Sequence, residues 1–353
     1  MAEENDDAEP FAACLVNSGN GDAKLEVAVD YFNPKLQKQE RTANLVVKCG
    51  DKTQTIRIRQ YIGLWNLGEG FSKWFENACG VYSTLVDRIV PGYPRDTAAQ
   101  LCERVGYQDN MLDKAEIFHL WVIEAPKEVA LEFPADKAGL NVLFVPSEAP
   151  YHERKVTLLN GPHTVLSPVG YLSGLNTVKE CCEDPLIGKF VHKVMYEELL
   201  PTLNLPENEL LQFAGDVMDR FRNPFVKHFV TSIMLNSFPK FRTRDLPGIK
   251  TYLERKGELP TGLVLGLAAI CTYYKGGKRG EDEIVPNDDQ KIVDLLKNLW
   301  ATGDVRQVAE GVLGAEFIWD EDLNVIPGLT RLLTKALALI QMEGMRAAVQ
   351  SIV

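Results

Sequence analysis

Apolar and polar side chains alternate with a period of two over residues 24–60, which is the pattern of extended strands. The run KLEVAVDYF (24–32) shows it clearly. Farther on, NLVVKC and TQTIRIRQ flank Gly50-Asp51-Lys52, a sequence typical of a hairpin turn. Residues 1–10, MAEENDDAEP, are acidic and poor in apolar side chains, and we expect them to be disordered. Residues 11–61 are therefore predicted to form a β-rich segment.

The pattern changes from Trp65 onward. Residues 71–90 have helical spacing and end in a β-branched run, and the sequence PGYP then interrupts the chain. A short helix is predicted over residues 97–106, and the apolar runs 116–125 and 140–146 predict strands.

From about Tyr151 to the C-terminus, apolar residues recur at helical spacing in segments separated by proline and glycine. We place a domain boundary near residues 147–151. The expected fold class is α+β and mainly α. It consists of a short β-rich N-terminal segment, a mixed region over residues 62–147, and a large all-helical domain over residues 148–353.

Composition excludes several classes of function. The net charge of −11 argues against a general nucleic-acid or anionic-membrane binder, because both need a basic face. The best apolar run, 263–274, is shorter than the roughly 18 residues of a membrane span, and the acidic start lacks signal-peptide features. Seven scattered cysteines without a CxxC pair predict reduced thiols and a cytoplasmic location. Five histidines without HxxxH or HxH spacing predict no metal site.

The stretch ERKVTLLNGPHTVLSPVGYL (153–172) sets Lys155, Asn160 and His163 into an apolar helix. At 100° per residue, Asn160 lies about 140° and His163 about 80° from Lys155, on one side of the helix. Pro162 cannot donate to the carbonyl of Leu158, so an acceptor is left free nearby.

These residue types suit proton transfer at a carbonyl or alcohol. A lysine whose pKa is lowered by burial can act as a general acid or base near neutral pH, and an amide can donate to a developing alkoxide. The alternative is structural. In that interpretation Lys155 extends from the helix start to solvent, Asn160-Gly161 makes a turn, and His163 is paired with a backbone carbonyl.

Longer blocks resemble a known family. KVTLLNGPH (155–163) resembles the K-x4-N-x2-H signature of the mannitol dehydrogenase family of polyol-specific long-chain dehydrogenases. STLVDRIVPGYPRD (83–96) resembles the family's V-D-R-I segment in the form of its tagaturonate-reducing branch. Further blocks in family order are AEIFHLWVIEAP (115–126), RFRNPFVKH (220–228), KFRTRDLP (240–247), IPGL (326–329) and GMR (344–346). The resemblance covers residues 62–353 and leaves out the first 60 or so.

The resemblance implies metal-free hydride transfer between NAD and a sugar acid, here reduction of D-tagaturonate to D-altronate. Lys155 is then the general acid/base, Asn160 polarises the carbonyl, and His163 helps to bind the substrate. Asp87 of V-D-R-I matches a family acid that tethers or tunes the lysine. The alternative for Asp87 is a helix-end ion pair with Arg88 or Arg95.

The cluster Lys240-Phe241-Arg242-Thr243-Arg244 contains a second candidate group. Lys240 matches a family lysine near the substrate. Arg242 and Arg244 can bind a substrate carboxylate through paired hydrogen bonds. The alternative is a solvated basic loop.

The resemblance also implies a dinucleotide-binding domain before V-D-R-I, with a glycine-rich turn after its first strand. The sequence contains no G-x-G-x-x-G, and too few residues precede Asp87 for a complete domain. Gly68-Glu69-Gly70 looks like a phosphate loop but leaves no room for the remaining βαβ units. Residues 62–147 are interpreted as the tail end of a truncated Rossmann-type domain, and the cofactor-binding residues stay unassigned.

The N-terminal segment has two interpretations. Residues 41–60 weakly resemble the closing strands of an immunoglobulin-like sandwich of the BACON type. Alternatively, residues 14–22 are a remnant of a family turn that brings Asn17 or Asn20 near the substrate.

Three hypotheses follow. The chain is a sugar-acid oxidoreductase, a catalytically inactive fragment that retains only the substrate-binding domain, or a β-sandwich module fused to that domain for adhesion or carbohydrate binding. A small sugar acid is the expected partner in the first two.

Overall fold

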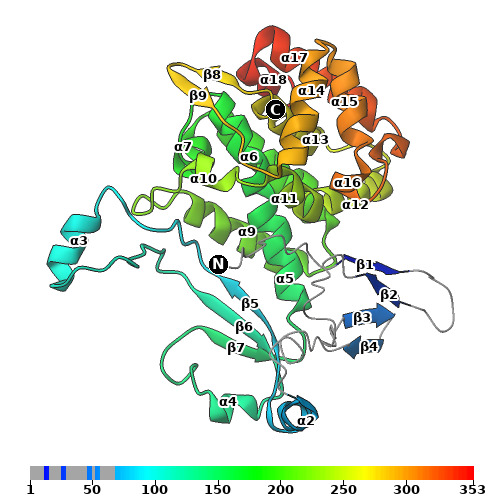
Figure 1. The fold of residues 1–353 in the computed structure, drawn as a ribbon. Helices are drawn as coiled ribbons and strands as arrows, with labels where there is room; N and C mark the ends of the chain where they lie inside the picture. The colour runs from blue at the N-terminus through cyan, green and yellow to red at the C-terminus, as the bar shows by residue number, and fades with distance from the viewer. Residues whose placement is uncertain (1–11, 16–24, 29–45, 50–51, 56–67) are drawn as a thin grey trace, which may run out of the picture. The chain divides into compact units, whose positions relative to one another are not determined.

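The computed structural model describes residues 12–15, 25–28, 46–49, 52–55 and 68–353 (Figure 1). The chain divides into two compact units, residues 1–81 and residues 82–353. The expected disorder of residues 1–10 and the suggested roles of Asn17 and Asn20 fall outside the described residues.

The first unit contains two antiparallel strand pairs and one helix. Its elements are β1 (Ala12–Leu15), β2 (Leu25–Ala28), β3 (Val46–Cys49), β4 (Lys52–Thr55) and α2 (Gly68–Ala78). Cys49 pairs with Lys52, so the predicted hairpin at Gly50-Asp51 is confirmed. Gly68-Glu69-Gly70, the stretch that looks like a phosphate loop in the sequence, forms the first turn of α2.

The second unit begins with a three-stranded sheet of β5 (Ser83–Asp87), β6 (Leu120–Glu124) and β7 (Val142–Val145). β5 runs antiparallel to β6, and β6 runs parallel to β7. The strands predicted within 116–125 and 140–146 are confirmed, as is a helix within 97–106, α3 (Ala98–Val105). The helical prediction for residues 71–90 is wrong at its end. The β-branched run there forms β5, which buries Leu85 and Asp87 on alternate positions.

Helices dominate from Ala149 onward, as predicted (Figure 1). The helices of the second unit, besides α3, are α4 (Val129–Glu132), α5 (Ala149–Lys155), η2 (Val156–Asn160), α6 (Gly161–Leu172), α7 (Val178–Glu183), α8 (Ile187–His192), η3 (Lys193–Leu199), η4 (Leu200–Thr202), α9 (Glu207–Phe221), α10 (Val230–Ile233), α11 (Ser237–Arg244), α12 (Leu246–Lys256), α13 (Thr261–Tyr273), α14 (Gln290–Ala301), α15 (Val305–Leu313), α16 (Glu316–Trp319), η5 (Leu323–Val325), α17 (Leu329–Glu343) and α18 (Met345–Gln350). Within the described residues, no helix is long and apolar enough to cross a membrane.

The helical region is not all-helical, which corrects the prediction. A hairpin of β8 (Gly277–Arg279) and β9 (Asp282–Ile284) follows α13. Gly276, Gly277 and Gly280 all have positive φ, a conformation that bends the chain into turns. The sequence KRGEDE (278–283) also lacks apolar residues at helical spacing, so a helix there would have no apolar face to bury.

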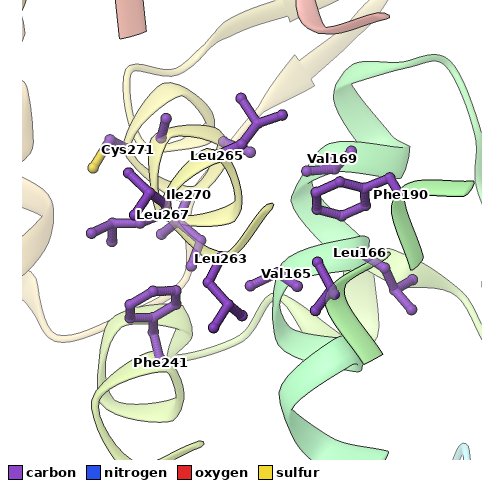
Figure 2. Packing of buried hydrophobic residues seen from close by; sticks show 14 of the residues in the cluster. Val165, Leu166, Val169, Phe190, Phe241, Leu263, Leu265, Leu267, Ile270 and Cys271 are labelled. Carbon is purple, nitrogen blue, oxygen red and sulfur yellow. The ribbon is translucent and has the colours of Figure 1, made fainter. Parts of the chain in front are cut away.

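Two apolar helices, α6 and α13, pack together at the centre of the core. Both bury residues on nearly every face, as expected for helices that lack a polar stripe. Figure 2 shows side chains of both helices together with Phe190 of α8 and Phe241 of α11. A Cβ on Gly266 of α13 would lie 2.5 Å from the Cβ of Val165, so this glycine permits the close approach of the helices. The contact holds α6, which carries His163, against the core.

Gly266→Ala is expected to lower the free energy of unfolding by about 1–3 kcal/mol, because the added methyl group overpacks the contact with Val165. Gly215→Ala in α9 is the matched control. Nothing lies within 4 Å of a Cβ placed there, and alanine favours a helix over glycine by about 0.5–1 kcal/mol. Urea unfolding followed by circular dichroism measures both. Equal effects of the two substitutions would contradict the close packing of α6 on α13.

Candidate functional site

The predicted site lies on one helix that is interrupted by a π-turn. Lys155 ends α5, Asn160 ends the π-turn η2, and His163 lies in the first turn of α6. The Gly161 N–H donates to the carbonyl of Val156, five residues earlier. The regular 100° spacing assumed from sequence is therefore wrong across this turn. An inserted π-turn is frequent at functional sites, because it redirects side chains without ending the helix.

Lys155 is half-buried beside charged groups from other elements. Burial lowers the pKa of its ammonium, as predicted; the Asp87 carboxylate acts in the opposite direction, and the Arg244 and Arg220 guanidiniums lower the pKa further. These groups come from β5, α11 and α9, far apart in sequence. A lysine in this setting gives up its proton closer to neutral pH than a free lysine does.

His163 is 5% exposed. Its ring stacks on Phe221 with centroids 4.0 Å apart and meets the edge of the His228 ring at 5.1 Å. Burial, with the neighbouring His228 and cations, lowers the pKa of His163 well below its usual value, so the imidazole is neutral at pH 7. Its buried Nε2 has no hydrogen-bond partner among the described residues, which leaves this atom available to a bound ligand.

Asn160 is half-buried at the end of the π-turn. Its backbone carbonyl accepts a 2.8 Å hydrogen bond from the Thr164 hydroxyl. That hydroxyl in turn accepts a 3.2 Å hydrogen bond from Nη1 of Arg244. The π-turn is thus connected to α11 through Thr164.

Asp87 is 2% exposed in β5 and is paired with Arg220 of α9, through hydrogen bonds of 2.7 and 3.1 Å. The alternative of an ion pair with Arg88 or Arg95 is therefore wrong. The guanidinium of Arg88 instead donates to the backbone carbonyl of Glu116 at 2.9 Å. The negative charge of Asp87 opposes the effect of burial on the pKa of Lys155.

The three basic side chains on α11 have different partners in the structure. Nζ of Lys240 donates to the carbonyl of Ile233 at 2.8 Å, and burial lowers its pKa to about 8. Arg244 reaches α6 and acts on both Lys155 and His163. Arg242 points elsewhere, to the carboxylate of Asp320 at 2.8 Å and the carbonyl of Ile318 at 3.2 Å. The structure therefore brings Arg244, but not Arg242, to the Lys155 group.

Sequence reasoning missed Arg220, Glu116, His228 and Asp245. All four lie inside blocks that carried the family resemblance, which was the available signal. Asp245 is fully buried, and neither carboxylate oxygen has a hydrogen-bond partner among the described residues. Burial raises the pKa of Asp245 well above its usual range, because the charged form is disfavoured away from water. Its Oδ1 lies 3.1 Å from where a Cβ on Gly161 would be, so only glycine fits easily at the start of α6.

The charges around Lys155 suit an anionic ligand. Lys155, Arg220 and Arg244 are cationic, whereas Asp87 and Glu116 are anionic, which leaves one positive charge in excess. This excess occurs in a chain whose net charge is −11. Across the described ranges, no group of three or more His, Cys, Asp or Glu side chains is arranged to hold a metal ion.

Two family models match the chain. The mannitol dehydrogenase C-terminal domain matches residues 149–341, and the mannitol dehydrogenase Rossmann domain matches residues 2–137. The second match begins at residue 2, contrary to our expectation that the first 60 residues lie outside the family resemblance.

Curated relatives named altronate oxidoreductase are similar over most of the chain. Those of Phocaeicola vulgatus and Bacteroides thetaiotaomicron are 70% and 69% identical over 84% of this chain, and that of Yersinia enterocolitica is 45% identical over 83%. The chain spans only 61–62% of the length of these relatives.

Two solved structures share the fold. Pseudomonas fluorescens mannitol 2-dehydrogenase, in a ternary complex with NAD and D-mannitol, superposes with a TM-score of 0.67 at 22% identity. The alignment covers 83% of this chain and 58% of that chain. A substrate-free D-sorbitol dehydrogenase superposes with a TM-score of 0.65 at 21% identity, over 82% of this chain and 58% of that chain.

Proposed function

Because the chain belongs to the mannitol dehydrogenase family, we propose that it reduces a keto-sugar acid, D-tagaturonate, to D-altronate with NADH. The observation that carries the proposal is the half-buried Lys155, on the same helix as the buried His163 whose Nε2 has no hydrogen-bond partner among the described residues. The relatives that are about 70% identical and named altronate oxidoreductase support the choice of substrate. A cytoplasmic location belongs to the same proposal and rests on the scattered cysteines.

In this mechanism the residues of the chain handle the proton and the carboxylate. The Lys155 ammonium donates its proton to the carbonyl oxygen as that oxygen gains negative charge. The Asn160 amide donates a hydrogen bond to the same oxygen. Neutral His163 uses its free Nε2 for a neighbouring hydroxyl of the substrate. For the reverse oxidation, Lys155 must first lose its proton.

Arg244 supplies the charge for the substrate carboxylate. Its guanidinium lies near both Lys155 and His163 and uses one nitrogen on Thr164. A guanidinium can bind a carboxylate through parallel hydrogen bonds. Lys240, one turn earlier on α11, adds a second cation.

The reduced nicotinamide supplies the hydride when it is bound. The described part of the chain does not fit a dinucleotide by itself, because none of its strands leads through a glycine-rich turn into a helix that could hold a pyrophosphate. Support for NAD comes from the Rossmann-domain match over residues 2–137. No residue is assigned to the cofactor.

NADH titration of the purified chain, followed by nicotinamide fluorescence, tests the proposal. We expect saturable binding, and then NADH oxidation that depends on added tagaturonate. If NADH does not bind but tagaturonate does, the alternative of a catalytically inactive sugar-acid binder is correct for this chain. If neither NADH nor tagaturonate binds, the assignment of a substrate site around Lys155 is wrong.

A further inference from the structure

The hydroxyl of Thr164 joins the π-turn to Arg244. It donates to the backbone carbonyl of Asn160 at 2.8 Å and accepts from Nη1 of Arg244 at 3.2 Å. Thr164 is 3% exposed, so bulk water does not compete for either bond. Because the hydroxyl hydrogen is committed to the carbonyl, the oxygen presents its lone pairs to the guanidinium. One buried hydroxyl therefore fixes the guanidinium to the backbone of the turn.

Arg244 is a half-buried cation that lacks a counter-ion in the described part of the chain. Arg220 and Arg242 both pair with carboxylates, whereas the side-chain bond of Arg244 goes to the neutral Thr164. The adjoining Asp245 does not bond to it, because both carboxyl oxygens of Asp245 lack a hydrogen-bond partner among the described residues. A charge partly removed from water without a partner is costly, so an anion from a ligand is the fitting partner.

The end of α11 packs on the turn that carries two candidate substrate-binding residues. The backbone oxygen of Arg244 lies 3.7 Å from where a Cβ on Gly161 would be. Asn160 precedes this glycine, and His163, with its unpartnered Nε2, follows it by two residues. A carboxylate bound by Arg244 would therefore lie beside the residues that hold the rest of the substrate.

We propose that Thr164 is a specificity-determining positioning residue, which selects sugar acids over neutral sugars by fixing Arg244 to the π-turn. The choice of a sugar acid as the ligand rests on the proposed function, whereas the fixing of Arg244 by Thr164 does not. A guanidinium that is free to rotate loses side-chain entropy when it binds a carboxylate, and the hydroxyl removes part of that cost beforehand. The hydroxyl thus matters for a substrate with a carboxylate and not for a neutral one.

Thr164→Val deletes the hydroxyl and keeps the branched shape of the side chain. We expect the KM for tagaturonate to rise about tenfold, less than the roughly 30-fold for Arg244→Gln, because the position of the charge is lost but not the charge. The kcat for tagaturonate and the kcat/KM for the neutral D-tagatose should stay near native. Thr164→Ser keeps a hydroxyl and should restore the native KM. In an Arg244→Gln chain, Thr164→Val should add little, because the two changes remove one interaction.

Thr272→Val in α13 is the matched control. The Thr272 hydroxyl donates to the carbonyl of Ala268 at 2.8 Å, the same bond within a helix, but no cation bonds to it among the described residues. Its KM should be native. If Thr164→Val does not fold, Thr164→Ala makes the same prediction, since alanine favours a helix. An unchanged KM for tagaturonate, or an equal loss of kcat/KM for D-tagatose, would overturn the proposal.

Labelling of Arg244 with phenylglyoxal, followed by mass spectrometry of its peptide, tests the same link without a reaction. We expect labelling several times faster in Thr164→Val than in the native chain or Thr164→Ser, because the guanidinium is released. D-altronate with NAD should protect Arg244 in the native chain, and the neutral D-altritol with NAD should not. Equal labelling rates in the native chain and Thr164→Val would contradict the proposal. Faster labelling in Thr164→Val without protection by D-altronate would support the hold of Thr164 on Arg244 and count against the proposed function.

Discussion

Lys155→Ala is expected to lower kcat for tagaturonate reduction by about 10²–10⁴-fold, because positioned proton transfer contributes this much to a reaction. The KM for tagaturonate should change far less, since Arg244 and His163 remain to bind the substrate. Initial rates of NADH oxidation give both constants. The exposed Lys189→Ala on α8 is the matched control and should keep the native rate.

The pH dependence gives a second signature of the same residue. Burial lowers the pKa of Lys155, so the protonated acid is present below this pKa and is lost as the pH rises through it. Reduction should therefore slow on the alkaline side, whereas oxidation of altronate should accelerate there. In Lys155→Ala, both the alkaline fall of the reduction rate and the alkaline rise of the oxidation rate should disappear. A variant that retained most of the native rate, or an unaltered pH profile, would exclude Lys155 as the proton donor.

Arg244→Gln is expected to raise the KM for tagaturonate roughly 30-fold, which corresponds to the loss of about 2 kcal/mol from a charged hydrogen-bonded contact. Glutamine removes the cation but keeps a polar side chain that can reach Thr164, the partner of Arg244 on α6. Steady-state kinetics with varied tagaturonate measure the effect. The neutral ketose D-tagatose is the comparison substrate, and its kcat/KM should be nearly unaffected.

Arg242→Gln is the matched control for this experiment. It removes the same charge from the same helix, but Arg242 is bonded to Ile318 of α16 and to Asp320, the residue that follows α16. We expect a KM within about twofold of native, because surface ion pairs of this kind contribute little. If Arg242→Gln raised the KM as much as Arg244→Gln, the substrate carboxylate would lie on the other side of α11.

Part of the candidate site could be predicted from the local sequence. Lys155, Asn160 and His163 lie within nine residues of one another, so their proximity follows from any helical conformation. The effect of burial on Lys155 was likewise expected from the apolar residues around it. The π-turn was not expected. It ends at Gly161, where a Cβ would meet Leu199 and Asp245 from other helices, and local spacing does not record such contacts. Spacing rules that assume a regular helix fail at such a turn.

The sequence by itself determined strands β6 and β7 and the helical character of the region from Ala149 onward, since alternation and helical spacing report burial one element at a time. It also determined the family, through blocks that keep their order along the chain. It did not determine β5 or the β8–β9 hairpin. Only the tertiary structure decided which charges meet. Asp87 and Arg220 are separated by 133 residues, and Arg244 turns toward Lys155 while Arg242 turns away from the same helix. Such partners are selected by how helices pack in space, and no local pattern records that packing.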